Sequence, residues 1–287
     1  MATPLVGNPG EAVRQSAPGL EFYKMSGSGN DFVVVDGRQP GAERVIDPAV
    51  VRRLCERRTG VGSDGVILLA PEVGASFRMI YLNSDGSRAA MCGNAALCST
   101  RLAAEIGLAD AAGMEFLTDS GPVQARLERG LPEIDLAPIR EVRPELDLSP
   151  HEGERRLGYV LAGVPHVVVC SDDVENVDVR GRGGELRRHP MFPEGTNVDF
   201  VSPARGRSAW SMRTFERGVE AETLACGTGA VASALLLTTW GMAGEETRIL
   251  TRSGLVLRVR LRRRGNDWLP SLSGEGRIVF QGQLRDV

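Results

Sequence analysis

The chain has 287 residues, a net charge of −3, 25% charged residues and 42% hydrophobic residues. At about 150 residues per domain, this length is enough for two domains with buried cores. The balanced charge argues against a nucleic-acid partner, and the longest apolar run, residues 230–237, is too short to cross a membrane. Residues 1–19 lack the apolar segment of a signal peptide, and we expect them to form a flexible tail.

The cysteines and the single lysine limit the cofactors and the location of the protein. The five cysteines have no spacing typical of a metal site, and their odd number argues against a closed disulfide framework. We therefore predict no bound metal and a reducing, cytoplasmic location. Lys24 is the only lysine among 34 basic residues, so a pyridoxal phosphate enzyme would have to form its Schiff base with this residue alone. We do not expect that cofactor.

In chain order, the first half is predicted to contain short strands and two helices. Residues 21–36 form two strands around a glycine turn at 27–30. A helix over 48–58 has Asp47 as its N-cap and Pro48 in its first turn. Further strands are expected at 66–70, 77–82, 115–117, 123–128 and 133–136, and a second helix at 94–106.

The second half is predicted to follow the same order. Strands are expected at 167–170, 198–202 and 209–216, a weak helix at 174–180, and closing strands near Arg248, Leu255 and Ile278. Residues 228–240 are apolar nearly all round, which indicates a helix enclosed by sheet. The basic stretch 258–264 is expected to be an exposed edge strand, where arginines discourage pairing with other chains.

Four pairs of segments recur in the same order and indicate an internal duplication. The pairs are 92–93 with 226–227 (both Cys-Gly), 118–123 with 251–256, 131–136 with 269–273, and 29–33 with 196–201. We therefore predict an α/β (α+β) fold of two pseudo-symmetric domains, each a mostly antiparallel sheet wrapped around a central helix.

The two Cys-Gly pairs point to acid–base chemistry. Cys92 and Cys226 each precede a predicted helix, where free N–H groups and the helix dipole favour a thiolate and can also bind a carboxylate. Two such thiols, one per half, suggest an acid–base pair across a cleft. A buried cysteine is more often a small apolar filler, and we interpret Cys55, Cys98 and Cys170 in that way.

Other motifs are less specific. Residues 60–65 match the dinucleotide pattern G-x-G-x-x-G, but the strand follows instead of preceding it, so a turn is favoured. Asn30 in the glycine turn either offers its side chain to a ligand or belongs simply to a turn. His166 is either a strand-end histidine or a functional group, and Glu216-Arg217 either a surface ion pair or a clamp for a zwitterion.

Together these segments resemble the diaminopimelate epimerases, from Phe22 to about Val279. The matching motifs are Lys24-Met25, 29–32 (Gly-Asn-Asp-Phe), 83–87 (Asn-Ser-Asp-Gly-Ser), 91–94 (Met-Cys-Gly-Asn), Pro165-His166, 192–197 (Phe-Pro-Glu-Gly-Thr-Asn), 216–218 (Glu-Arg-Gly) and 225–229 (Ala-Cys-Gly-Thr-Gly).

The resemblance implies a cofactor-free isomerase that interconverts L,L- and meso-diaminopimelate, on the route to lysine and peptidoglycan. It implies that the final strand crosses back to the first domain, so that the domains span 20–137 plus 275–287, and 138–274. By position, Cys92 and Cys226 would be the two bases. The implied substrate-binding residues are Asn30, Asn83, Gly93, Asn94, Asn197, Glu216, Arg217, Gly227 and Thr228, with His166 in a supporting role. The partner would be a small amino acid, and a homodimer stays open.

The sequence departs from the usual family pattern at a few positions. Ala95 and Leu97 replace a glycine and an arginine, Val164 replaces an asparagine, Ser26 stands where histidine is frequent, and Gly65 stands where some members have a substrate-contacting glutamine. A racemase for a different amino acid therefore stays open. A non-catalytic amino-acid-binding protein and a thiol redox protein are the alternatives from other classes.

Overall fold

The structure is a computed structural model that describes residues 19–285. The expected tail over residues 1–19 lies outside the described residues, except for Gly19. In the described part of the chain, no helix is long and apolar enough to cross a membrane.

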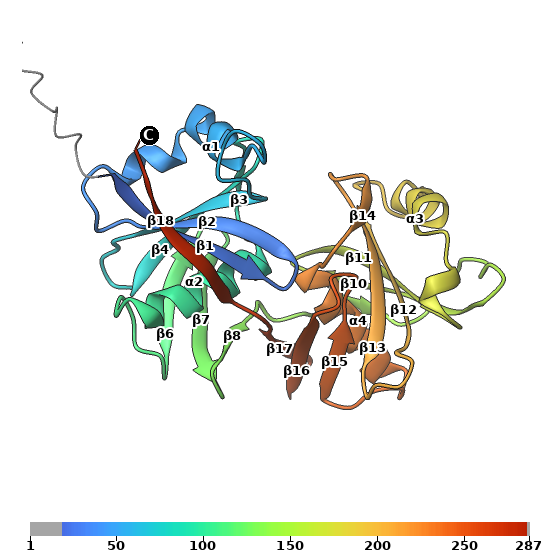
Figure 1. The fold of residues 1–287 in the computed structure, drawn as a ribbon. Coiled ribbons are helices and arrows are strands. Elements are labelled where there is room, and N and C mark those ends of the chain that lie inside the picture. Colours follow the sequence, from blue (N-terminus) through green and yellow to red (C-terminus); the bar gives the residue numbers. More distant parts are fainter. Residues whose placement is uncertain (1–18, 286–287) are drawn as a thin grey trace, which may run out of the picture.

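The first half of the chain forms eight strands, two α-helices and a short 3-10 helix (Figure 1). They are β1 (Leu20–Gly27), β2 (Asn30–Asp36), η1 (Ala42–Ile46), α1 (Pro48–Cys55), β3 (Gly65–Ala70), β4 (Phe77–Asn83), β5 (Arg88–Ala89), α2 (Gly93–Glu105), β6 (Met114–Thr118), β7 (Gly121–Glu128) and β8 (Leu131–Asp135).

The second half repeats this series and adds one strand at each end. It contains β9 (Val142–Arg143), β10 (Glu154–Ala162), β11 (Val164–Ser171), η2 (Val174–Asn176), α3 (Val179–Arg187), β12 (Asn197–Pro203), β13 (Trp210–Glu216), β14 (Ala221–Thr223), α4 (Gly227–Thr239), β15 (Glu246–Leu250), β16 (Val256–Arg264), β17 (Asp267–Ser273) and β18 (Arg277–Leu284).

The strand pairings repeat from one half to the other. β2 and β3 pair in parallel, as do β11 and β12, while β4 pairs in parallel with β6 and β13 with β15. The other pairings within each half are antiparallel. The predicted pseudo-symmetric α/β fold with mostly antiparallel sheets is therefore confirmed.

Two pairings, β1 with β18 and β8 with β17, join segments that are far apart in the sequence. The final strand, β18, pairs with β1 at the start of the described chain, and β9 pairs with β10 in the equivalent place. β8 pairs with β17, so all 18 strands belong to one continuous sheet. Figure 1 shows β18 crossing beside β1, on the side of α2.

The sheet curves around two central helices, α2 and α4. Residues 230–237 of α4 are all buried, as the apolar pattern predicted. Both helices end at a glycine with left-handed backbone, Gly107 (φ 64) and Gly241 (φ 72). In each case the next residue closes the last turn, because Leu108 N donates to Ala103 O and Met242 N to Leu237 O, both at 2.8 Å.

Several local predictions are wrong. α1 ends at Cys55 instead of residue 58, because Glu56 is extended (φ −60, ψ 122). The helix expected at 174–180 is a short 3-10 turn, and α3 begins later, at Val179, where the side chain of Asp178 caps the Gly181 N–H. β10 was not predicted. The edge-strand interpretation of 258–264 is also wrong, because β16 pairs with β15 on one side and with β17 on the other.

The register also corrects one of the four sequence repeats. β2 and β11 occupy equivalent places, since each is the first strand of a parallel pair, with Phe32 opposite Gly65 and His166 opposite Asn197. The equivalent of Asn197 is therefore Gly65, and the proposed match of 29–33 with 196–201 is wrong. The other three repeats fall on equivalent elements.

Candidate active site

The N-termini of α2 and α4 meet at two glycines. A Cβ atom at Gly93 would lie 3.9 Å from the Cα of Gly227, and one at Gly227 would lie 3.8 Å from the Cα of Gly93. Leu272 of β17 packs against both, with its Cδ2 at 3.3 and 3.0 Å from the same two positions. Cys92 and Cys226 are the N-cap residues of the two helices, so the duplication brings the predicted thiols to one junction.

Each thiol lies beside free backbone N–H groups. The Gly229 N–H donates to Cys226 Sγ at 3.4 Å. Cys92 makes no side-chain cap hydrogen bond, but the backbone N–H groups of Asn94 and Ala95 lower its pKa in part. We expected these donors to lower the pKa of the thiols. Burial outweighs them: it raises the pKa of Cys92 to about 11 and that of Cys226 well above its usual value. Both groups are therefore protonated at neutral pH.

Two predicted asparagines connect the first helix to the glycine turn. Asn94 Nδ2 donates to Asn30 Oδ1 at 2.7 Å, and Asn30 Nδ2 donates to Asp64 Oδ2 at 3.0 Å. Asn94 Oδ1 is buried and has no hydrogen-bond partner among the described residues. An unpaired buried acceptor at a helix start is suited to a donor group of a ligand.

The other predicted polar residues lie at strand ends. Asn197 Oδ1 accepts from the Arg217 backbone N–H at 2.8 Å, so it orders the loop that follows β13. Glu216 ends β13 and accepts from Thr223 Oγ1 at 2.6 Å. Burial raises the pKa of Glu216, although the hydrogen bond from Thr223 lowers it in part. Asn83 ends β4 and donates to Ser87 Oγ at 3.1 Å. Glu216 and Arg217 form no ion pair with each other in the described chain.

His166 is fully buried and belongs to a chain of polar contacts. Its Nδ1 lies 2.7 Å from Asp199 Oδ2, and its Nε2 lies 2.9 Å from Thr228 Oγ1. Thr214 Oγ1 donates to Asp199 Oδ1 at 2.7 Å, and Thr228 Oγ1 is 3.5 Å from Cys226 Sγ. We missed Asp199 and Thr214 in the sequence. The available signal was an acidic residue inside the otherwise apolar strand 198–201.

Three of the residues that depart from the family pattern, Ala95, Leu97 and Gly65, are packed against other parts of the protein. Ala95 and Leu97 are fully buried in the core around α2. Gly65 lies against Tyr81: a Cβ there would be 2.5 Å from Tyr81 Cε2 and 3.1 Å from its hydroxyl oxygen. The ring of Tyr81 therefore occupies the space that a side chain at position 65 would need.

Lys24 is held within the protein. Its ammonium group donates to Asp31 Oδ2 at 2.6 Å and also to the carbonyl oxygen of Gly62. The residues that the structure describes contain no group of three or more side chains arranged to hold a metal ion.

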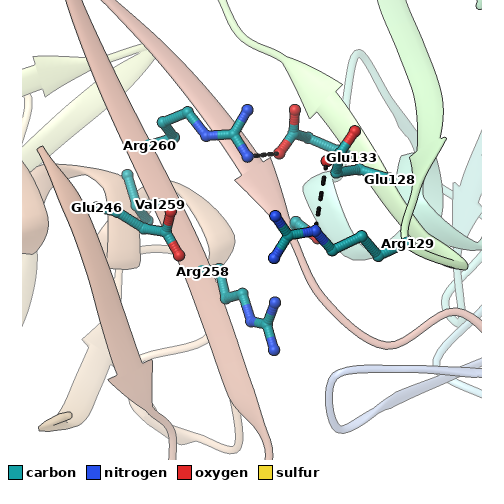
Figure 2. Close-up of a pocket in the computed structure, with 8 residues that line it drawn as sticks. Glu128, Arg129, Glu133, Glu246, Arg258, Val259 and Arg260 are labelled. Carbon is teal, nitrogen blue, oxygen red and sulfur yellow. Dashed lines mark ion pairs between the residues drawn. The ribbon is translucent and has the colours of Figure 1, made fainter. Parts of the chain in front are cut away.

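A pocket on another part of the surface does not include the thiols. Figure 2 shows it between the β7–β8 hairpin and strands β15 and β16, with acidic and basic side chains facing one another. Arg260 lies 3.5 Å from Glu133, and Arg129 lies 3.8 Å from Glu128. These charges are paired with one another, so the helix junction is the better candidate for the active site.

Comparison with known proteins gives the family. The sequence model of diaminopimelate epimerase matches residues 22–133 and 158–268. The diaminopimelate epimerase of Gemmatimonas aurantiaca is 46% identical over 276 residues, covering 92% of this chain and 99% of that protein. That of Aquifex aeolicus is 38% identical, covering 93% of this chain and 98% of that protein.

Solved structures agree in fold at low sequence identity. A phenazine biosynthesis protein of the PhzF family from Bacillus anthracis aligns with a TM-score of 0.70 at 14% identity, covering 92% of this chain and 98% of that chain. A hydroxyproline epimerase from Agrobacterium vitis aligns with a TM-score of 0.64 at 19% identity, covering 92% of each chain. With the sequence matches above, the conclusion is direct: this chain belongs to the diaminopimelate epimerase family.

Proposed function

We propose that this protein is an isomerase that interconverts L,L- and meso-diaminopimelate, without a cofactor, in lysine and peptidoglycan precursor synthesis. Cys92 and Cys226 are its two acid–base groups. The observation that carries this proposal is the junction of two helix N-termini, each with a cysteine as N-cap, in a chain whose relatives are diaminopimelate epimerases.

Inversion at a carbon requires removal of the α-proton from one face and delivery of a proton to the other. One cysteine acts as thiolate base while the other acts as thiol acid. Both thiols are protonated at neutral pH, so the base must ionise when substrate binds. The ammonium group of an amino acid, added to the N–H groups already present, opposes the effect of burial on the thiol pKa.

The substrate carboxylate next to the reacting carbon fits the helix junction. The N–H groups at Gly93-Asn94 and Gly227-Thr228 would bind it and stabilise the charge that develops as the α-proton leaves. The unpaired Asn94 Oδ1 would accept from the ammonium group. The remaining predicted contacts, for the far end of the substrate, are Asn30, Asn83, Asn197, Glu216 and Arg217.

A racemase for a different amino acid is the second candidate. It is supported by two departures from the family pattern: the ring of Tyr81 fills the space beside Gly65, and the apolar Val164 begins β11. The chemistry at the two cysteines would be the same, and only the substrate would differ.

The test is incubation of the reduced protein with L,L-diaminopimelate in D2O, with NMR detection of the α-proton. Loss of that signal with formation of the meso isomer is expected. Cys92→Ala and Cys226→Ala should each abolish the reaction, whereas Cys170→Ala, a buried cysteine of β11, should retain it. Normal turnover by either single alanine variant would contradict the two-base mechanism. Exchange with other amino acids only would favour the second candidate.

We also propose the domain division 20–137 plus 275–287, and 138–274. It is supported by the pairing of β18 with β1 and by the repeated pairings within each half. The free cysteines among the described residues are suited to a reducing compartment, and we propose the cytoplasm.

A homodimer is proposed through β18, which pairs only with β1 in the described chain. Val279 and Phe280 on this strand are 46% and 47% exposed, and an unpaired apolar strand edge is a ready site for another strand.

A further inference from the structure

The two halves differ in one buried layer of side chains behind the thiols, which is made of four pairs of equivalent positions. The strand register makes Phe32 equivalent to His166 and Ile67 equivalent to Asp199. Tyr81 pairs with Ile67 as Thr214 pairs with Asp199. Counting three residues from each cysteine makes Ala95 equivalent to Gly229.

In the first half this layer is apolar. Phe32, Ile67 and Ala95 are fully buried, and the ring of Tyr81 packs edge-on against Phe32 with 5.8 Å between ring centres. The thiol of Cys92 therefore has no side-chain hydrogen-bond partner among the described residues.

In the second half the same layer is polar and equally buried. His166 and Asp199 are fully buried, and Thr214 is 2% exposed. A Cβ at Gly229 would lie 2.3 Å from Asp199 Oδ1, so the carboxylate occupies the space that Ala95 fills with a methyl group in the first half. The absence of a side chain at Gly229 lets the carboxylate approach the first turn of α4, whose dipole favours a negative charge.

The hydrogen-bond directions along this chain follow from Asp199. A carboxylate only accepts, so Thr214 donates to one oxygen and His166 donates its Nδ1–H to the other. In the neutral imidazole His166 Nε2 is then an acceptor, and Thr228 donates its hydroxyl proton to it. The Thr228 oxygen is left to accept from the S–H of Cys226. Because the Thr228 hydroxyl proton is given to His166, it is not available to a Cys226 thiolate, and the Thr228 oxygen has a donor only when Cys226 is a thiol.

We propose that Asp199 is a positioning residue that acts through His166 and Thr228 to hold Cys226 as the protonated thiol. This rests on the proposed function, in which Cys226 is then the proton donor and Cys92 the first base. Cys92 as thiolate takes the α-proton and becomes a thiol, while Cys226 gives its proton to the opposite face and becomes a thiolate. Burial and the carboxylates of Glu216 and Asp199 also disfavour the thiolate of Cys226, whereas the Gly229 N–H favours it. His166 is the titratable group that contacts Thr228.

The test measures each thiol separately and needs no substrate. Iodoacetamide alkylation of Cys92 and Cys226 is followed by mass spectrometry of the peptides between pH 7 and 10, where the rate follows the thiolate fraction. In the wild-type protein Cys92 should react faster than Cys226. In Asp199→Asn, loss of one nearby charge should raise the Cys226 rate about tenfold at a given pH. The Cys92 rate should stay within about twofold of wild type, because the layer behind Cys92 is unchanged.

Two variants control for disturbance of the layer. Ile67→Val changes the equivalent position in the first half, and Thr214→Val removes one donor but keeps the Asp199–His166 contact. Both should leave the ratio of the two alkylation rates within about twofold of wild type. Equal acceleration of both thiols in Asp199→Asn, or no change in either, would overturn the proposal even if the protein is a proven epimerase.

A measurement on the unaltered protein covers the case in which Asp199→Asn does not fold. The chain has only three histidines, so 15N-histidine labelling gives few NMR signals. The buried His166 should carry its proton on Nδ1, facing Asp199, and have an unprotonated Nε2, facing Thr228. A proton on Nε2 would refute the proposed bond directions.

Discussion

Replacement of Gly229 by alanine should destabilise the protein, against the usual effect of this change in a helix. Gly229 lies in the first turn of α4, where alanine would normally add up to about 1 kcal/mol of stability. Here the new methyl group would lie 2.3 Å from Asp199 Oδ1 and 3.0 Å from its Cγ. This is about 1 Å or more inside ordinary contact distance, and the buried carboxylate has to move.

The expected cost can be built from the contacts of that carboxylate. Movement of Asp199 weakens the bonds from Thr214 and His166, both at 2.7 Å. Loss of one hydrogen bond to a buried charge costs about 1.5–3 kcal/mol, and overpacking a core costs about 1–3 kcal/mol. After the helix gain is subtracted, we expect a net loss of about 2–4 kcal/mol. For a chain of this size, that lowers Tm by roughly 4–10 °C.

Thermal unfolding followed by calorimetry, with matched scan rates, measures the effect. The matched control is Ala95→Gly, the reverse change at the equivalent position of α2. It should cost only about 1 kcal/mol from helix propensity and a small cavity. If Gly229→Ala raises Tm, or leaves it unchanged, then Asp199 does not occupy the space beside α4 and the polar layer described above is wrong.

Three further predictions concern the thiols and the exposed strand. Burial raises the pKa of Cys92 to about 11, so its alkylation rate in the free protein should increase through pH 8, 9 and 10; a plateau already at pH 8 would contradict a raised pKa. Oxidation should join Cys92 to Cys226 and inactivate the protein until a reductant is added, because the helices that carry these residues meet; an oxidised sample with full activity and no crosslink would count against it. Phe280→Arg should reduce self-association through β18, measured by light scattering after gel filtration, while Arg277→Lys on the same strand should not; an unchanged mass for Phe280→Arg would place any dimer contact elsewhere.

The sequence by itself determined the features that depend on local chemistry. Both central helices begin and end within a residue of the predicted positions, because a cysteine-glycine start, an apolar face and a glycine stop are all local signals. The two Cys-Gly helices and the duplicated turns at 118–121 and 251–254 were visible for the same reason. The family resemblance needed nothing more, since its motifs are short and contiguous.

The tertiary structure decided whatever depends on residues far apart in the chain. The pairing of β18 with β1 and the contact between Gly93 and Gly227 join segments separated by more than one hundred residues. The strand register was also needed to find which residues of the two halves are equivalent. The sequence repeat had aligned Asn197 with Asn30, whereas the register aligns it with Gly65.

The chemistry of the site divides in the same way. The position of each thiol at a helix N-terminus could be read from the residues beside it. Its protonation could not, because burial by the surrounding sheet outweighs the N–H donors of the helix. The asymmetry between the two thiols arises one layer further out, where Asp199 faces Gly229 in one half and Ile67 faces Ala95 in the other. Packing brings these residues together across strands and helices, and only the folded structure contains that information.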